Sequence, residues 1–375
     1  MSFVQSEFYE DWMQKEGIPI HQEMYGIKDI TELPRRPWAR TGGLGTFVEL
    51  EATKQARELI YVAEIPAGGA LEPEKHLYDE LIYILRGRGL MEVWRTGQAK
   101  ATFEWGAGSL FAVPLNAWHR LVNGSQEPVI MMGVSNAPVL MNAFRNTEFI
   151  FNCDYNFPDF TGKADYFLPG EKRFKEAGSG GLNFWETNFI PDMRTARLDD
   201  QPAKVEGGQV TSFKMGAWNG AHAAQWPSGV YMKAHYHGPG AVILILEGEG
   251  YALLWHRLYG IHPYQDGHGD KVTRFDWKPG SIYSPQNEWF HQHFNTGNEP
   301  TRSLRWTGGG SGVEIPTLRK QAVGYFSLRD GGSEIYYDDE DPEIRKVFQE
   351  ELQSKGTKFV MSPVTYRTDT FRESF

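Results

Sequence analysis

The sequence predicts an all-β protein in which one structural module occurs twice, with helices at its periphery. Aromatic residues make up 14% of the 375 residues, with 23 Phe, 17 Tyr and 12 Trp, a composition typical of β-structure. Short segments rich in Val, Ile, Leu and aromatic residues are separated by GRG, GEG, GAG and KPG, which predicts antiparallel strands joined by tight turns. The third observation is an internal repeat.

The repeat pairs two stretches of the first half with two of the second. "EKHLYDELIYILRGRGLMEVW" (74–94) aligns with "HYHGPGAVILILEGEGYALLW" (235–255), and "FEWGAGSLFAVPLNAWHRLVN" (103–123) aligns with "FDWKPGSIYSPQNEWFHQHFN" (275–295). Self-similarity of this kind indicates one supersecondary unit used twice. The predicted divisions are an N-terminal, partly helical extension (1–50), a first module (51–150), a connection (151–205), a second module (206–330) and a C-terminal extension with a helix (331–375).

The segments outside the modules have other compositions. "EFYEDWMQKE" near the start and "DPEIRKVFQEELQSK" (341–355) near the end read as helices; in the second, Asp341 would be the N-cap and Pro342 the first helical residue. Between the modules, "FPDFTGKADYFLPGEKRFKEAGSGG" has the Pro, Gly and charge content of a surface connection. We place the boundary near residue 180.

Charge and cysteine content narrow the class of partner. The net charge of -10 comes without a Lys/Arg-rich block, which argues against nucleic acid or an anionic membrane surface and favours a small-molecule substrate. The N-terminus lacks the apolar region of a signal peptide, and no run of 18 apolar residues occurs. The single Cys153 fits a reducing compartment. We therefore predict a cytoplasmic protein with Cys153 buried and inert.

The two copies carry two sets of corresponding residues, and the spacing is the same in both copies except that Pro285 stands one residue early, with one extra residue before His291. A first set is Gly68, Glu74, His76, Glu80 and Gly87 in the first copy and Gly229, His235, His237, Ala241 and Gly248 in the second. A second set is Gly108, Pro114, Asn116, His119 and Asn123, and Gly280, Pro285, Asn287, His291 and Asn295. Their order and spacing resemble the two motifs of the cupin superfamily. The resemblance implies a bicupin, with two jelly-roll β-barrels.

In cupins the motif histidines converge inside the barrel on a divalent metal. The resemblance therefore implies that His235, His237 and His291 bind metal in the second copy, where Ala241 stands at the position of the family's Glu. Three neutral imidazoles suit Fe(II), but Mn, Zn, Ni and Cu remain open, because affinity alone does not select among them. His293 shares the strand face of His291. It is either the alternative third ligand or a catalytic acid or base.

The first copy offers a possible second metal site formed by Glu74, His76, Glu80 and His119. Two histidines with one or two carboxylates are a plausible set for a non-haem iron or a Mn site. The alternative is that this half has lost its metal, with Glu74 paired to Lys75 or another cation at the surface. The first copy would then be structural, and the second the reactive half.

Two further features of the second copy are candidates for substrate contact. The segment "RLYGIHPYQDGHGD" (257–270) is an insertion relative to the first copy, and its His262, Tyr264 and His268 would either close over the barrel mouth or be solvated. Arg302 and Arg305 are three residues apart on a predicted strand, so at most one faces inward. We expect each to be a surface residue rather than a carboxylate clamp.

Three histidines without a motif Glu resemble the gentisate 1,2-dioxygenase-like cupins, although that group usually carries this set in its first cupin. The resemblance implies an Fe(II) dioxygenase acting on a small oxygenated or aromatic acid. A metal-dependent lyase, isomerase or decarboxylase is the first alternative, although Ala241 and Glu74 each remove one ligand of the oxalate-decarboxylase-like pattern. A non-catalytic small-molecule-binding bicupin is the second. Exposed sheet edges favour a homodimer.

Overall fold

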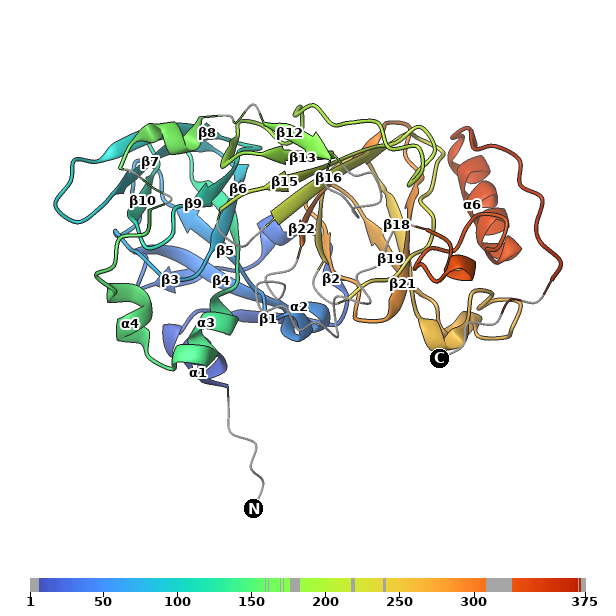
Figure 1. Cartoon of the computed structure of the whole chain (residues 1–375), viewed down its shortest axis with the longest axis horizontal. Helices are drawn as coiled ribbons and strands as arrows, with labels where there is room; N and C mark the ends of the chain where they lie inside the picture. Colours follow the sequence, from blue (N-terminus) through green and yellow to red (C-terminus); the bar gives the residue numbers. More distant parts are fainter. Residues whose placement is uncertain are drawn as a thin grey trace, which may run out of the picture.

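The computed structural model describes residues 7–158, 160, 162–168, 170, 172–175, 183–216, 220–238, 241–307, 326–369 and 371. The chain folds into two β-barrels side by side, with helices at both ends (Figure 1). The all-β prediction is confirmed. The predicted boundary near residue 180 lies outside the described residues.

The first barrel consists of an eight-stranded and a three-stranded sheet. The large sheet has the order β1-β4-β5-β11-β6-β9-β14, with β3 paired to β4, and the small sheet has the order β10-β7-β8. The strands are β1 (Ile20–Glu23), β3 (Arg36–Trp38), β4 (Gly43–Leu50), β5 (Leu59–Ile65), β6 (Glu80–Arg86), β7 (Arg88–Trp94), β8 (Ala101–Gly106), β9 (Leu110–Val113), β10 (Trp118–Val122), β11 (Val129–Ser135) and β14 (Phe189–Ile190).

The second barrel has the same construction. Its large sheet has the order β12-β13-β15-β16-β22-β17-β20-β2, and its small sheet has the order β19-β18-β21. The strands are β2 (Gly26–Ile27), β12 (Arg173–Lys175), β13 (Asn183–Glu186), β15 (Gln209–Lys214), β16 (Gly220–Trp226), β17 (Ala241–Glu247), β18 (Gly250–His256), β19 (Thr273–Trp277), β20 (Ile282–Tyr283), β21 (Trp289–Asn295) and β22 (Thr301–Thr307).

The two strand orders bear out the repeat seen in the sequence. β5-β11-β6-β9 of the first barrel corresponds to β16-β22-β17-β20 of the second, and β10-β7-β8 corresponds to β21-β18-β19. Steric crowding explains why the second residue with no side chain, Gly89 in GRG and Gly250 in GEG, is required at each turn. A Cβ on Gly89 would lie 2.1 Å from the carbonyl oxygen of Val122, and a Cβ on Gly250 would lie 1.9 Å from that of Phe294. No larger residue fits at either turn.

The barrels exchange edge strands. β2 comes from the N-terminal segment and pairs with β20 of the second barrel, while β14 lies within the predicted connection and pairs with β9 of the first. β4 lies within the predicted N-terminal extension, yet it pairs with β5 in the first barrel's large sheet. That sheet therefore begins before residue 51, because the segment 43–50 is buried almost throughout.

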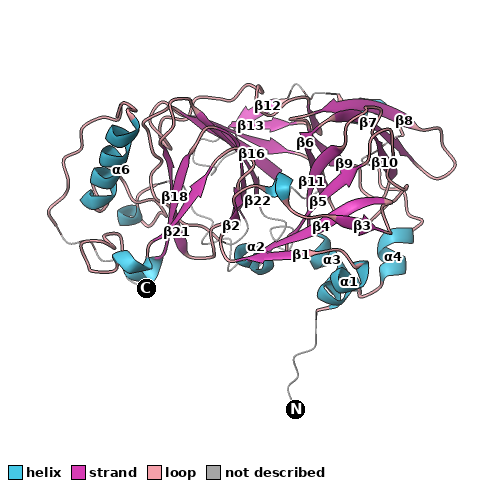
Figure 2. Ribbon diagram, turned by 180° about the vertical axis from the view of Figure 1, so that it is seen from behind, coloured by secondary structure: helices cyan, strands magenta, loops and turns pink. Residues whose placement is uncertain are grey.

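Helices lie at both ends of the molecule, and one helix, α2, lies between the ends (Figure 2). They are α1 (Phe8–Glu16), α2 (Glu51–Ala56), α3 (Ala137–Phe144), α4 (Thr147–Asn152) and α6 (Pro342–Lys355), with short 3-10 turns η1 (Ile30–Glu32), η2 (Ala164–Phe167), η3 (Arg257–Tyr259), η4 (Gly269–Lys271) and η6 (Leu328–Asp330). Both predicted helices are present, and Asp341 caps α6 by accepting a hydrogen bond from the Glu343 amide. No helix within the described residues is long and apolar enough to cross a membrane.

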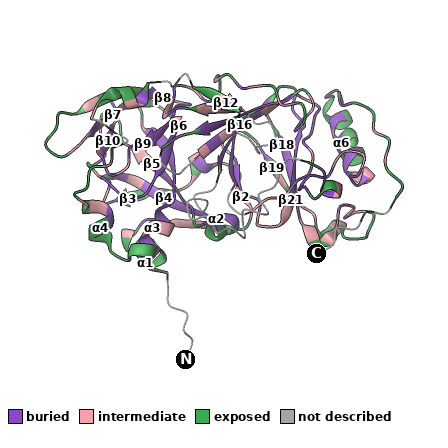
Figure 3. Ribbon diagram, in the orientation of Figure 1, coloured by how far each residue is buried: buried purple, intermediate pink, exposed green. Residues whose placement is uncertain are grey.

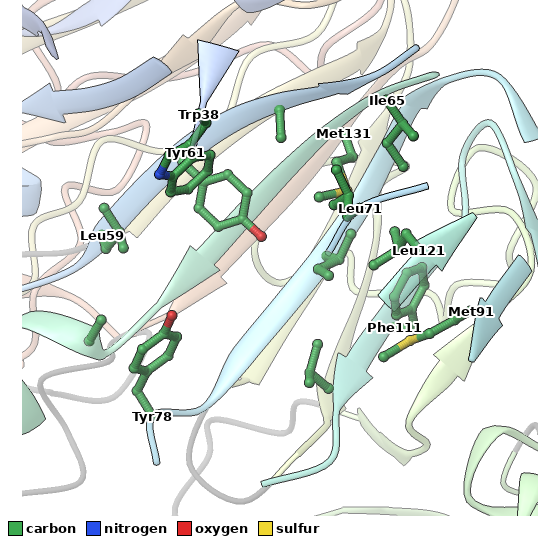
Figure 4. Packing of buried hydrophobic residues seen from close by; sticks show 14 of the residues in the cluster. Trp38, Leu59, Tyr61, Ile65, Leu71, Tyr78, Met91, Phe111, Leu121 and Met131 are labelled. Carbon is green, nitrogen blue, oxygen red and sulfur yellow. The ribbon is translucent and has the colours of Figure 1, made fainter. Parts of the chain in front are cut away.

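Three clusters of buried side chains fill the structure, and buried residues run along the strands of both barrels (Figure 3). One lies inside the first barrel, where Phe111, Leu121 and Met91 gather together (Figure 4). The second lies inside the second barrel and includes apolar residues of α6. The third joins the barrels, since it contains Leu81 and Leu110 as well as Leu304.

Candidate metal centres

The second barrel brings His235, His237 and His291 together. One nitrogen from each ring lies within 4.8 Å of the others. His235 follows β16 and forms an isolated backbone bridge with His291 on β21, with N to O distances of 3.2 and 2.9 Å. The backbone therefore holds two of the three rings against each other.

His235 and His237 do not lie on a regular strand. His235 lies in isolated bridges, to His291 on one side and to Glu334 on the other, and His237 lies in irregular backbone. The two rings still converge on His291, with centroids 4.2 and 4.6 Å from the His291 ring. Convergence comes from the bridges, and not from alternation along a strand.

Each of these histidines has one ring nitrogen fixed by a backbone carbonyl. The contacts are His235 Nδ1 to Lys233 O at 3.1 Å, His237 Nδ1 to Gly238 O at 2.8 Å and His291 Nδ1 to Trp289 O at 3.1 Å. Because a carbonyl oxygen only accepts hydrogen bonds, Nδ1 carries the proton and Nε2 presents its lone pair. This is the tautomer of a metal-binding histidine whose other nitrogen is held by the protein.

The surroundings keep the three rings uncharged. Burial, followed by neighbouring positive groups, lowers the pKa of His235 and His291 well below the usual value, and burial lowers the pKa of His237 to about 4. Lys204 acts on all three and Arg305 on His237 and His291. Three neutral imidazoles with converging lone pairs form a donor set that fits a divalent transition metal.

His293 lies beside this cluster and not in it. Its ring centroid is 5.6 Å from that of His291, and its Nδ1 lies 2.7 Å from the hydroxyl oxygen of Tyr283. Acid-base catalysis by His293, one of the two roles that the sequence left open, would require an imidazole pKa near its usual value. The structure does not support such a pKa. Burial, together with Arg305 and His291, lowers the pKa of His293 well below the usual value, so the ring is neutral.

The first barrel brings His76, Glu80 and His119 together, again with ligand atoms within 4.8 Å of one another. Nδ1 of His76 and of His119 faces a backbone carbonyl, at 2.8 and 3.0 Å. His76 Nε2 lies 3.3 Å from Glu80 Oε2 without the alignment of a hydrogen bond. Two imidazole lone pairs and a buried carboxylate form a mixed N/O set that also fits a divalent metal.

Glu74 does not join that set. Arg40 binds its carboxylate and also Glu16, and the Arg40 guanidinium lies over the rings of Trp12, Trp38 and Phe151. Of the partners that the sequence suggested for Glu74, Lys75 is not the one used, because it is buried and donates to the Cys153 carbonyl at 2.7 Å; the other cation is Arg40. A cavity of about 350 Å³ that borders this network is lined by Phe8, Trp12, Lys15, Glu16, Arg40, Thr147 and Phe151.

The two arginines of β22 differ from expectation. They face opposite sides as predicted, but both are buried and neither is a surface residue, with 6% of Arg302 and 2% of Arg305 exposed. Arg302 binds the Ala196 carbonyl, which lies within the predicted connection. Arg305 lies inside the second barrel, where its Nη2 is 3.5 Å from Met232 Sδ and its charge acts on the cluster histidines. The neighbouring strands bury both side chains, and the three-residue spacing in the sequence does not reveal this burial.

The inserted segment 257–270 contacts the C-terminal helix. The amides of Tyr264 and Gln265 both donate to the Asp341 carboxylate, at 2.8 and 2.9 Å. His268 is exposed and lies against the Tyr259 ring.

Cys153 is half-buried, and not buried as predicted, because it lies just beyond the end of α4.

Four residues near the two clusters were missed by sequence reasoning. They are Arg40, Lys204, His222 and Tyr283. Arg40 and Lys204 come from segments outside the motifs, so no spacing signal exists for them. Tyr283 could have been found, since it stands in the second motif region two residues before Pro285. Strand β20, which carries it, pairs with β17.

Comparison with known proteins gives a family match for the first barrel. Residues 61–135 match the Cupin domain family. No curated protein matches the chain. The first barrel is thus a cupin domain, and since the second barrel repeats its strand order, the chain has the bicupin architecture that the sequence predicted.

Among solved structures, oxalate decarboxylase from Bacillus subtilis is similar at 14% identity and a TM-score of 0.47, over 76% of this chain and 77% of that one. Oxalate decarboxylase from Lactobacillus farciminis, in complex with formate, is similar at 12% identity and the same TM-score, over 76% and 86%. A further structure of the Bacillus subtilis enzyme is described with Mn(II) centres.

Proposed function

We propose that the second barrel is the reactive half of a metal-dependent enzyme acting on a small carboxylic acid. The observation that carries the proposal is the convergence of three neutral histidines, each with Nδ1 held by a carbonyl, next to the buried Arg305 and Lys204. Three uncharged ligands leave a divalent metal its full charge, and the two cations add to it. A small anion is the complementary substrate.

The reaction that we favour is a metal-assisted lyase or decarboxylase reaction. When bound, the metal would polarise a coordinated carboxylate or carbonyl oxygen as a Lewis acid. Large buried side chains lie beside the neighbours of the cluster, where Trp226 and Tyr283 contact His293 and Met232 contacts Arg305. That crowding favours a compact acid over an aromatic one. Arg305 and Lys204 would stabilise the negative charge on such a substrate, and this reaction would consume no O₂.

An Fe(II) dioxygenase is the second candidate. It is favoured by the second-barrel cluster of His235, His237 and His291 (the second cluster), which has no carboxylate ligand among the described residues; Ala241 stands at the start of β17. The identity of the metal, with Fe, Mn, Zn, Ni or Cu as candidates, and the homodimer remain predictions. Elemental analysis of protein purified without chelator tests the identity of the metal. Light scattering tests the homodimer.

The deciding experiment measures O₂ uptake and CO₂ release over a panel of small carboxylic acids, including oxalate, and hydroxylated aromatic acids. CO₂ release without O₂ uptake supports the lyase or decarboxylase, whereas stoichiometric O₂ uptake with an aromatic acid supports the dioxygenase. Full metal content with no turnover of any acid would favour a non-catalytic binding protein.

The matched pair of variants is His237→Ala and His76→Ala. His237→Ala should lose most of the metal held by the second barrel and all measurable turnover, because one of three protein ligands is gone. His76→Ala disturbs only the first cluster and should leave turnover largely intact. Full activity in His237→Ala, or abolished activity in a folded His76→Ala protein, would assign the chemistry to the first barrel.

A further inference from the structure

His293 differs from the histidines of the two clusters in the partner of its Nδ1. In His76, His119, His235, His237 and His291, Nδ1 lies 2.8 to 3.1 Å from a backbone carbonyl oxygen. In His293 it lies 2.7 Å from the Tyr283 hydroxyl. A carbonyl fixes the tautomer of a histidine, but a hydroxyl can donate or accept. The balance of the local hydrogen bonds therefore decides the tautomer of His293.

Tyr283 and His293 are both fully buried, so unpaired polar atoms are costly there. The bond to His293 is the single hydrogen bond of the Tyr283 hydroxyl within the part of the chain that the structure describes. If the hydroxyl donates, its proton and the Nδ1 lone pair are both satisfied, and one donor, Nε2–H, remains. If the hydroxyl accepts, its own proton and the Nε2 lone pair are both left over. Donation by Tyr283 leaves fewer unpaired groups.

The His293 ring, which carries the remaining donor, lies next to the second cluster. His293 is on the same face of β21 as His291, and its ring centroid is 6.2 Å from that of His235. His293 Nε2 is buried and has no hydrogen-bond partner among the described residues. Arg305 makes the surrounding potential positive, since its charge acts on His293 and on Tyr283. A buried N–H in such a potential is complementary to an oxygen that carries negative charge.

We propose that Tyr283 is a positioning residue that holds His293 as an Nε2–H donor, and that this donor binds a carboxylate oxygen of the substrate beside the metal. The inference deepens the proposed function and rests on it for the identity of the ligand as substrate. His293 then orients the substrate by donating a hydrogen bond in its neutral form, with no proton transfer.

The tautomer is tested first, by ¹⁵N NMR of histidine-labelled, metal-free protein, with the His293 signals assigned from their loss in His293→Gln. We expect His293 to carry its proton on Nε2, and Tyr283→Phe to reduce that population. Tyr251→Phe is the matched control, because Tyr251 is also a buried tyrosine of this barrel and its hydroxyl has no hydrogen-bond partner among the described residues. A proton on Nδ1 in the unaltered protein would overturn the inference even if no variant folds.

Binding is tested with formate as the carboxylate probe on zinc-loaded protein. Tyr283→Phe should weaken formate binding about tenfold, the size expected for one hydrogen bond to a charged group, with zinc content unchanged. Tyr251→Phe should bind formate normally. Unchanged affinity in Tyr283→Phe would overturn the inference while leaving the proposed function standing. Weakened formate binding, in a protein that turns over no acid, would support the subsite and remove the proposed function.

Discussion

At the scale of single residues, the second cluster depends on which nitrogen of each histidine carries the proton. His291 and His293 have the same strand parity, and the sequence left open which of them completes the set with His235 and His237. The structure separates them by their partners: a carbonyl holds His291, and a hydroxyl holds His293. Only His291 shares the 4.8 Å cluster.

This difference predicts opposite behaviour of two variants. His291→Ala should lose most of the second-barrel metal, because a ligand with fixed orientation is removed. His293→Gln should keep near-normal metal content, since its ring lies outside the cluster. Metal per chain, measured by elemental analysis after gel filtration, checks both. Metal loss in His293→Gln with retention in His291→Ala would exchange the two assignments.

At the scale of elements, the C-terminal extension is held to the second barrel by a buried polar network. Glu340 accepts hydrogen bonds from Tyr231 and, at 3.1 Å, from Gln292 on β21. The next residue, Asp341, caps α6 and binds the inserted loop. Burial raises the pKa of Glu340 to about 8. The carboxyl group is therefore protonated in the folded protein at neutral pH.

Glu340 should make stability depend on pH in a defined direction. Because its folded-state pKa is raised from a usual value of 4.5 to about 8, its contribution is full below about pH 4.5 and is lost as the pH rises through 8. Between pH 6 and 8 the unfolding free energy should fall by about 2 kcal/mol more in the unaltered protein than in Glu340→Gln. Urea unfolding at the two pH values measures this. The exposed Glu350→Gln on α6 is the control and should behave as the unaltered protein.

The elements also show what a sequence can and cannot specify. Both helices and the repeat were predictable, because caps and turn glycines are local signals, and the convergence of His235, His237 and His291 was implied by the resemblance to the cupin motifs. The pairing of Glu74 with Arg40 was not, since 34 residues separate them and the contact exists only after β4 has joined the first barrel. The burial of Arg302 and Arg305 likewise follows from neighbouring strands and the connection.

At the scale of the whole molecule, the barrels are joined as one unit. Strands β2 and β14 cross between them, and the third buried cluster contains residues of both. Within it, the ring of Tyr83 on β6 lies edge-on to that of Trp306 on β22, with centroids 6.5 Å apart. Strand β2 pairs with β20, which carries Tyr283, so the N-terminal segment supports the second-barrel site. Neither barrel keeps its full sheet without the other.

This joining predicts that both barrels unfold in one cooperative transition. Leu304→Ala removes a fully buried side chain from the joining cluster and should cost about 2–5 kcal/mol. Calorimetry of Leu304→Ala should show a single transition at a lower midpoint. The control, Leu121→Ala, makes a similar deletion inside the first barrel and should also lower a single transition. If Leu304→Ala instead resolves two transitions, or if Leu121→Ala shifts only part of the heat, then the barrels are independent units and the exchanged strands do not couple their stability.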